Sequence, residues 1–291
     1  MTFNREVKNE LLELWQRNMC CRICELMGLL LFSTDYSSSA IGLKTDSEKQ
    51  ADLYAKLSKK CMNLNPKKSK NNRFYSVYFD EKDISFVLNN FNLDVVDSLF
   101  KCENCKKAFL TGAFISSGII SNPQKEYRLE FISKSEDISC VLYRILFEFQ
   151  LNPKMTIKNK KVSVYLKTSE SIEDLLTLMG AVKSSLNMMN TKIFKDVINN
   201  TNRKINFETA NLKKAADSSA KHIAAIEKIE NENKFSALAE DLQKIAIARK
   251  ENIGMSLNEL GDMFGLSRSG VYHRLKKICD FADKIKNSEG L

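Results

Sequence analysis

The stretch SLNELGDMFGLSRSGVYHRLKKI, residues 256–278, decides the architecture of the C-terminal third of the chain. Ser256 and Glu259 have the spacing of a capping box, which begins a helix, and Gly265 is placed to end that helix as a C-cap. Ser267 is then placed as the N-cap of a second helix. Two short helices joined by a tight glycine turn predict a helix-turn-helix.

The second helix of this motif is predicted to be amphipathic. Val271, Leu275 and Ile278 recur at helical spacing and would form its buried face. The N-terminal end of such a helix enters the major groove of DNA, where side chains contact base edges and phosphates. The candidate DNA contacts are Ser267, Arg268, Ser269, Tyr272, His273, Arg274, Lys276 and Lys277. We expect Arg268 and Ser269 to contact bases, and Arg274, Lys276 and Lys277 to contact phosphates.

Two other interpretations of this motif stay open. The first is a helical hairpin whose basic outer face is only solvated. In the second, Arg268 or Tyr272 contacts a protein partner such as a sigma factor or another regulator. Upstream, the patterns predict helices at about 184–200, 206–232 and 235–250. We therefore expect a linker helix over 201–221 and an all-α DNA-binding domain over 222–291.

An internal repeat organises the N-terminal two thirds. CRICELMGLLLFS, residues 21–33, and CKKAFLTGAFISS, residues 105–117, share a leading cysteine, a central glycine and a final serine. Each segment is apolar nearly all round, which is typical of a buried helix. A glycine in the middle of a helix indicates close approach of a second backbone. We therefore predict two helices packed through Gly28 and Gly112, in a pseudo-symmetric α+β domain with halves of about 1–100 and 101–200.

The segment Leu110–Gly118 resembles the LAGLIDADG motif, and residues 26–34 are a poorer copy. In LAGLIDADG homing endonucleases, an acidic residue near the end of each such helix holds the divalent metals that cut DNA. The matching positions here are Ser33 and Ser117, which lack the anionic oxygen that Mg²⁺ requires. The resemblance therefore implies a nuclease-like fold without nuclease activity.

The whole chain resembles the WhiA family of bacterial regulators of sporulation and cell division, which joins a degenerate LAGLIDADG-like part to a C-terminal helix-turn-helix. The resemblance rests on residues 3–11, 20–22, 109–118, 202–203, 206–211 and 270–275. Phe207 stands where the family pattern has cysteine, and Thr34 replaces the glycine that closes the first repeat. The resemblance implies a transcription regulator that binds double-stranded DNA.

Composition agrees with a nucleic-acid partner. The chain carries a formal net charge of +9, which favours a polyanion, although many lysine-rich faces are only solvated. The longest apolar run, residues 26–32, is too short to span a bilayer, and the first residues lack the apolar core of a signal peptide. We expect a cytoplasmic, nucleoid-associated protein with no membrane contact. The oligomeric state is left open.

A second basic cluster lies between Leu53 and Phe79, where seven basic residues occur without an acid. In a LAGLIDADG-like fold this segment would lie on the strand surface that faces DNA. The alternative is a solvated, lysine-rich loop around Pro66. The candidate contacts of this second DNA surface are Lys67, Lys68, Lys70, Arg73 and Tyr75.

The cysteines offer one weak metal site. Cys21 with Cys24, and Cys102 with Cys105, have the spacing of zinc ligand pairs, and packing of the two repeat helices would bring the pairs together. The favoured interpretation is that these thiols are small buried apolar groups, so we expect no metal and no cofactor.

Catalysis finds little support in the sequence. The two histidines, His222 and His273, fall in predicted helices of the C-terminal third and accompany no nucleophile or phosphate-binding glycine loop. We expect a DNA-binding transcription regulator that is not an enzyme. The alternatives are an adaptor that binds a sigma factor or a division protein, and a residual nuclease or maturase-like RNA binder.

Overall fold

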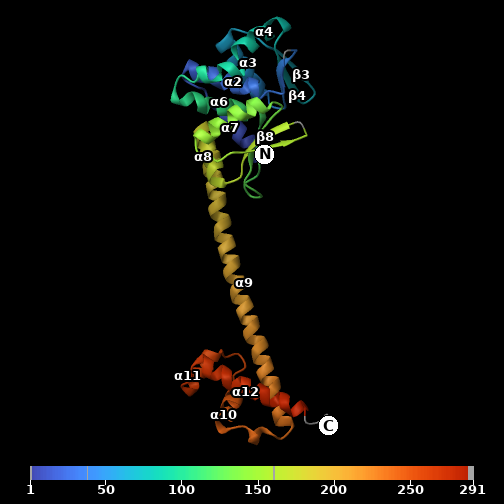
Figure 1. Ribbon diagram of the computed structural model, residues 1–291, viewed down its shortest axis with the longest axis vertical. Coiled ribbons are helices and arrows are strands. Elements are labelled where there is room, and N and C mark those ends of the chain that lie inside the picture. Colours follow the sequence, from blue (N-terminus) through green and yellow to red (C-terminus); the bar gives the residue numbers. More distant parts are fainter. Residues whose placement is uncertain (1, 38, 160, 288–291) are drawn as a thin grey trace. The chain divides into compact units, whose positions relative to one another are not determined.

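The computed structural model describes residues 2–37, 39–159 and 161–287 of the chain, with the side chains of 286 and 287 left out (Figure 1). The chain divides into two compact units, residues 1–196 and 197–291. The first unit mixes helices with antiparallel sheets, and the second is helical. The predicted fold class, α+β followed by all-α, is confirmed.

The first unit consists of two similar halves. The first half contains α1 (Phe3–Glu13), α2 (Met19–Leu31), β1 (Asp35–Tyr36), β2 (Ile41–Thr45), α3 (Glu48–Met62), β3 (Lys67–Asn71), β4 (Phe74–Tyr78), α4 (Glu81–Asn90), the 3-10 helix η1 (Leu93–Val95) and α5 (Val96–Leu99). The second half contains α6 (Glu103–Ser117), β5 (Gly118–Ile120), β6 (Leu129–Ser133), α7 (Glu136–Glu148), β7 (Lys154–Lys158), β8 (Lys161–Leu166) and α8 (Ser169–Met179). The strand orders β1-β2-β4-β3 and β5-β6-β8-β7 are equivalent, which confirms the internal repeat.

The two halves also begin their sheet-covering helices in the same way. Ser47 caps α3 by accepting a hydrogen bond from the Gln50 backbone N–H, and Ser135 caps α7 by accepting one from Ile138. In each half, a hydroxyl two residues earlier, on Thr45 or Ser133, accepts a hydrogen bond from the capping serine's own backbone N–H at 3.1 Å. These side chains satisfy backbone donors that a helix start leaves unpaired, so each strand passes into its helix at a fixed residue.

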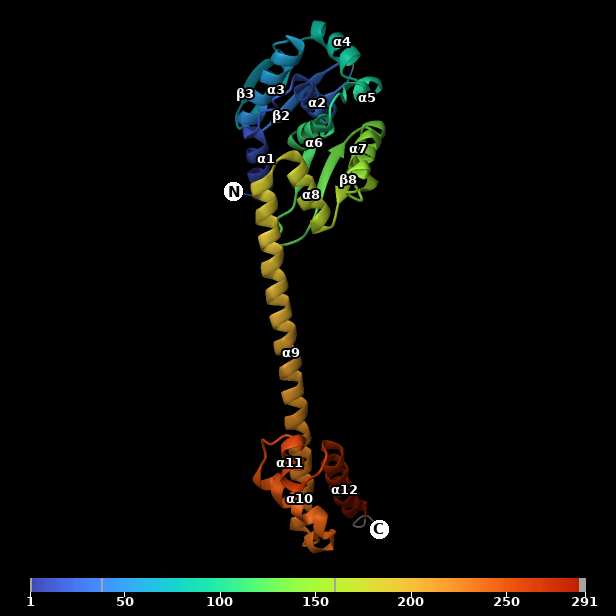
Figure 2. The same cartoon turned by 90° about the vertical axis from the view of Figure 1, so that its left-hand side faces the viewer.

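The helices α2 and α6 lie side by side at the centre of the first unit (Figures 1 and 2). A Cβ atom added to Gly28 would lie 2.2 Å from the Phe109 carbonyl oxygen, and one added to Gly112 would lie 2.0 Å from the Glu25 carbonyl oxygen. Only glycine permits this approach, as the sequence predicted. Apolar side chains then seal the crossing, and the rings of Phe32 and Phe109 meet edge-on with centroids 6.4 Å apart.

The β3–β4 and β7–β8 pairs are tight hairpins at equivalent places in the two sheets. Asn72 and Asn159 have positive φ angles of 51° in the respective turns, a conformation that asparagine tolerates better than most residues. Strands β7 and β8 pair with Lys158 opposite Lys161, and Lys160 lies outside the described residues. The segment interpreted alternatively as a loop around Pro66 continues as strand β3.

One prediction about the helices is wrong. The sequence pattern predicted a break between helices ending near Asn200 and beginning near Asn206, but α9 runs without interruption from Val182 to Asn231. No glycine or proline occurs within these 50 residues, so nothing in the local sequence ends the helix. No helix in the described part of the chain is long and apolar enough to cross a membrane.

The second unit packs the end of α9 against three further helices. Its elements after α9 are the 3-10 helix η2 (Phe235–Ala237), α10 (Glu240–Glu251), α11 (Leu257–Phe264) and α12 (Arg268–Asn287). The apolar core of this unit includes Ile226 and Ile229 of α9, Leu260 of α11, and Val271 and Leu275 of α12. The α11–α12 pair is thereby anchored on one side and exposed on the other.

Candidate nucleic-acid interface

Local hydrogen bonds define the turn between α11 and α12. The Ser256 backbone N–H donates to Glu259 Oε2 at 2.7 Å, and the Glu259 N–H donates to Ser256 Oγ at 3.3 Å, so the predicted capping box is present. Gly265 ends α11 with a φ of 63°, in the left-handed region that favours glycine. A Cβ on Gly261 would lie 2.3 Å from the Leu266 carbonyl oxygen, so this residue lets the turn fold back closely.

The helix α12 presents one buried and one open face. The Gly270 backbone N–H donates to Ser267 Oγ at 3.2 Å, so Ser267 caps the start of the helix as predicted. Val271, Leu275 and Ile278 are fully buried. The other predicted contacts apart from Arg274 are exposed, and they are Arg268, Ser269, Tyr272, His273, Lys276 and Lys277. The open face therefore carries cations together with hydroxyl and imidazole groups.

Arg274 has a different environment from the other cations of α12. Its Nε lies 3.1 Å from Asp241 Oδ2 on α10, and its Nη1 donates to the Gly270 carbonyl oxygen at 3.3 Å. Through the contact with Asp241, Arg274 links α12 to α10. Arg268, Lys276 and Lys277 form no ion pair with any described residue, so their charges remain available to an external anion. The predicted phosphate role of Arg274 therefore competes with a structural one.

A buried polar side chain supports the loop before α11, a role that the local sequence pattern did not indicate. Arg249 of α10 is only 3% exposed, and its guanidinium donates to the Met255 carbonyl oxygen in the loop before α11. His222 of α9 is also buried, and burial together with the positive charge of Arg249 lowers the pKa of its imidazole to about 4. The sequence did contain a signal for Arg249. This charged residue continues the helical spacing of the apolar residues Leu242, Ile245 and Ala246, which places it on the buried face of the helix.

A groove of about 960 Å³ adjoins the start of α12. Arg268 and Tyr272 line it from α12, while Phe207, Glu208 and Asn211 line it from α9. The latter three belong to the segment 206–211, one of the segments on which the family resemblance rests. The structure thus brings that segment next to the predicted base-contacting residues.

The second basic surface lies on strands β3 and β4. Lys67 Nζ lies 2.6 Å from Asp80 Oδ1, and Lys68 Nζ lies 2.5 Å from Asp52 Oδ1, so acids from elsewhere in the chain pair with both lysines. Lys70 Nζ is 5.0 Å from the centre of the Tyr75 ring. Arg73 lies over a neighbouring phenylalanine ring. DNA contact by this surface stays a prediction. The acids that pair with Lys67 and Lys68 already neutralise part of its positive charge.

Ser33 and Ser117, the residues predicted to replace nuclease acids, lie at the ends of the repeat helices α2 and α6. Ser33 Oγ lies 2.7 Å from the Leu30 carbonyl oxygen and 2.9 Å from that of Asp35, so its one proton can be donated to either, and Ser117 Oγ donates to the Ala113 carbonyl oxygen at 3.4 Å. A hollow of about 230 Å³ lies at this place, and its described lining includes Lys134 and Lys161 but no acid. Its donor set therefore suits an anion better than a divalent metal.

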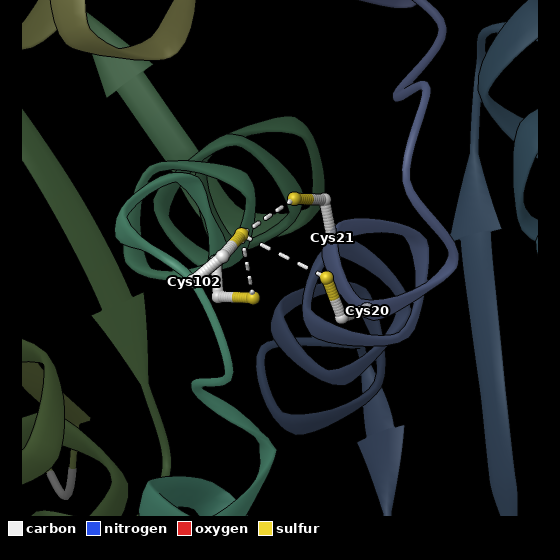
Figure 3. A group of neighbouring side chains, drawn as sticks. Cys20, Cys21 and Cys102 are labelled. Atoms are coloured by element: carbon white, nitrogen blue, oxygen red, sulfur yellow. Dashed lines mark hydrogen bonds between the residues drawn. The ribbon is translucent and has the colours of Figure 1, made fainter.

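The cysteines assemble differently from the predicted zinc set of Cys21, Cys24, Cys102 and Cys105. The thiols that meet are those of Cys20, Cys21, Cys102 and Cys105, whose sulfur atoms all lie within 4.8 Å of one another (Figure 3). Cys24 lies one turn further along α2, and its thiol donates to the Leu99 carbonyl oxygen at 3.3 Å. Hydrogen bonds from the thiols of Cys105 and Cys21 lower the pKa of the Cys102 thiol to about 7.

The fold and these sites define a class of protein: a degenerate LAGLIDADG-like domain joined on one chain to a helix-turn-helix domain. Family models agree, since the WhiA LAGLIDADG-like domain matches residues 106–198 and the WhiA C-terminal HTH domain matches residues 201–282. The chain belongs to the WhiA family.

Relatives and one solved structure cover almost the whole chain. The "Probable cell division protein WhiA" of Clostridium botulinum is 33% identical over 98% of this chain and 99% of its own length. The protein of the same name from Lachnospira eligens is 32% identical over 100% of this chain and 99% of its own. The crystal structure of full-length WhiA from Thermotoga maritima is 25% identical, covers 98% of this chain and 99% of that one, and superposes with a TM-score of 0.59.

Proposed function

We propose that this protein is a DNA-binding transcription regulator that binds promoters through the N-terminal half of α12. The observation that carries the proposal is the open face of α12, where Arg268, Lys276 and Lys277 have no ionic partner among the described residues. The match to the WhiA C-terminal HTH domain supports the same use of this face. The names of the relatives favour genes of cell division as targets, and the family resemblance adds sporulation.

In this proposal the start of α12 enters the major groove. Its first backbone N–H groups point toward the DNA, and the helix dipole favours the approach of phosphate. Arg268 would donate to the O6 and N7 atoms of a guanine, while Ser269, Tyr272 and His273 would contact neighbouring bases. Lys276 and Lys277 would neutralise phosphates and release counterions, which adds affinity without sequence preference.

The proposal includes the absence of DNA cleavage. A LAGLIDADG nuclease needs acids at its helix ends. Ser33 and Ser117 stand there instead, and their hydroxyl groups donate hydrogen bonds to carbonyl oxygens of the helices. Lys134, which lines the same hollow, donates to the Thr34 carbonyl oxygen at 2.9 Å. We therefore expect supercoiled plasmid to stay intact with Mg²⁺ or Mn²⁺, and nicking at the rate of an active nuclease would reject this part of the proposal.

The test uses DNA selected from a random pool by the full-length protein, with affinity measured by fluorescence anisotropy over a salt series. Arg268→Ala should weaken binding to the selected sequence by about 10- to 100-fold and relax preference at one base position. Lys276→Ala with Lys277→Ala should reduce the salt slope by roughly one to two units, with equal loss on all sequences. Lys284→Ala, on the same helix but beyond the motif, is the matched control and should leave affinity unchanged.

The same measurement separates the regulator from an adaptor. Selection of no sequence above background, together with equal weak binding by wild type and Arg268→Ala, would contradict promoter recognition. If a purified sigma factor then bound wild type but not Tyr272→Ala, the open face of α12 would belong to a protein partner instead.

A further inference from the structure

Four thiols from two distant parts of the sequence meet at the start of the central helix pair. Cys102 Sγ lies 3.5 Å from Cys21 Sγ, 3.5 Å from Cys105 Sγ and 3.7 Å from Cys20 Sγ (Figure 3). All six pairs of sulfur atoms in the group are within 4.8 Å. These separations exceed the roughly 2.05 Å of a disulfide bond, so the four cysteines are free thiols gathered in one place.

The spacing matches the requirement of one tetrahedral metal ion. Zinc binds thiolate sulfur at about 2.3 Å, which places sulfur atoms at the corners of a tetrahedron about 3.8 Å apart. Three of the sulfur pairs lie within a few tenths of an ångström of this value. The thiols would therefore reach an ion through small side-chain rotations, without moving the backbone of either helix.

The pseudo-symmetry of the fold explains why the thiols converge. Cys20 and Cys21 lie in the first turn of α2, while Cys102 is the N-cap of α6 and Cys105 lies in its first turn. The glycine crossing holds the two helices in backbone contact, so their N-terminal ends are neighbours. Both helix dipoles then present their positive ends to the group, which favours sulfur in its anionic form.

We propose that Cys20, Cys21, Cys102 and Cys105 bind one Zn²⁺ as a structural tetrathiolate site. All four ligands come from the protein, which is typical of a closed structural centre and leaves no position for a substrate. Sulfur-only ligation selects a soft ion over Mg²⁺ or Ca²⁺. Cys20 and Cys102 are partly accessible, so an ion has a route in, while Cys21 and Cys105 are buried.

The alternative is that the thiols serve as small apolar groups, and Cys24 shows what that role looks like in the same helix. Cys24 is buried, and its thiol donates to the Leu99 carbonyl oxygen. Cys20 and Cys102, by contrast, are partly exposed, and their thiols lie against other thiols, which are weak donors and acceptors. A shared cation would give all four sulfur atoms one strong partner.

The first measurement is the zinc content of the full-length protein, purified under reducing conditions from zinc-supplemented cells without a chelator. About one equivalent per chain is expected, and less than about one tenth would overturn the proposal. The second is replacement of zinc by Co²⁺, which should give the visible and charge-transfer absorption of a tetrahedral sulfur-only site. A spectrum without sulfur-to-cobalt charge transfer would also overturn it.

Variants locate the ion. Cys20→Ser and Cys102→Ser should each lower the bound zinc by at least about tenfold at a fixed chelator concentration, because each removes one of four ligands. Cys24→Ser is the matched control inside α2, and Cys140→Ser is an exposed control on α7; both should keep full occupancy. Because the wild-type zinc content and the cobalt spectrum need no variant, a cysteine substitution that fails to fold leaves the proposal testable.

Discussion

Two helix pairs of the described chain, α2–α6 and α11–α12, depend on glycine, but the two pairs differ in how much of their surface is buried. In the α2–α6 pair, Gly28 and Gly112 bring two backbones together, and nearly every side chain between Cys24 and Leu31 is buried. In the α11–α12 pair, Gly261 and Gly265 shape a turn, and only one face of each helix is buried. The first pair is buried on all sides where its helices cross, over Cys24–Leu31 and Ala108–Ile115, whereas the second keeps a face free.

A helix pair buried on all sides has a structural role, whereas a pair buried on one side only can also bind a partner. A helix segment that is buried on all sides has no surface left for a ligand, so a substitution within Cys24–Leu31 of α2 or Ala108–Ile115 of α6 should act through stability. An amphipathic helix such as α12 is held by Val271, Leu275 and Ile278, so its exposed residues should change binding with little effect on folding.

Gly112→Val should be the most damaging single change. The new Cβ would lie 2.0 Å from the Glu25 carbonyl oxygen, which is backbone and has no room to yield, so α2 and α6 must separate. We expect a loss of about 3 kcal/mol or more in the free energy of unfolding. Urea unfolding followed by the fluorescence of Trp15, the single tryptophan, reports on this unit.

Gly254→Ala is the control for that experiment. No heavy atom lies within 4 Å of the Cβ position at Gly254, so this substitution should change stability by less than about 0.5 kcal/mol. If Gly112→Val unfolded at the wild-type urea concentration, the backbone contact would have no part in holding the α2–α6 pair.

Glu25 should make the stability of the first unit depend on pH. Its carboxyl is buried in α2 with no hydrogen-bond partner among the described residues, and burial raises its pKa to about 8. The folded chain therefore holds this proton between the unfolded value near 4.5 and about pH 8, so stability falls as pH rises through that window. The slope attributable to this group is at most about 1.4 kcal/mol per pH unit.

Glu25→Gln removes the titration and should flatten the dependence of the urea midpoint on pH between 5 and 8. Glu251→Gln, an exposed carboxyl at the end of α10, is the matched control and should preserve the wild-type slope. Identical slopes for wild type and Glu25→Gln would show that the buried carboxyl is ionised in the folded protein.

Arg274→Ala tests whether this arginine belongs to the fold or to the interface. Loss of its contacts with Asp241 and the Gly270 carbonyl oxygen should cost about 1 kcal/mol of stability in the second unit. A double-mutant cycle with Asp241→Ala, followed by far-ultraviolet circular dichroism, should give a coupling of about 0.5 kcal/mol. Zero coupling, together with a loss of DNA affinity as large as that of Arg268→Ala, would return Arg274 to the DNA contacts.

The smallest effect is expected at the second basic surface. Replacing Lys67, Lys68 and Lys70 together by alanine should weaken DNA binding by less than about threefold, because Asp80 and Asp52 already pair with two of the three charges. The anisotropy series used for α12 measures this directly. A loss comparable to that of Arg268→Ala would make the β3–β4 face a primary DNA site.

Local patterns in the sequence predicted most of the fold correctly. Residues close together in the sequence determine the capping box at Ser256 and the C-cap at Gly265, and the internal repeat determines the glycine crossing. All three could therefore be predicted from the sequence pattern. The break predicted near residue 201 was wrong because the change in composition there includes no glycine or proline. A change in amino-acid composition does not by itself end a helix, as α9 shows.

The site was less accessible to sequence reasoning, because its partners come from distant segments. Nothing near Arg274 indicates that Asp241 pairs with it, and nothing near Lys67 points to Asp80. The cysteine group shows the same limit. Spacing suggested Cys24, but the helix start at Met19 places Cys20 and Cys21 beside Cys102, and Cys24 one turn away.

Chromatin immunoprecipitation with sequencing tests in the cell whether α12 recognises promoter DNA. Cells carrying the tagged wild-type chain should show enrichment at a set of promoters that share one sequence motif. Cells carrying Arg268→Ala at equal abundance should lose that enrichment, because the substitution removes a base contact and leaves the buried face of α12 intact. Wild-type and Arg268→Ala profiles that coincide, or a wild-type profile without promoter peaks, would contradict promoter recognition by α12.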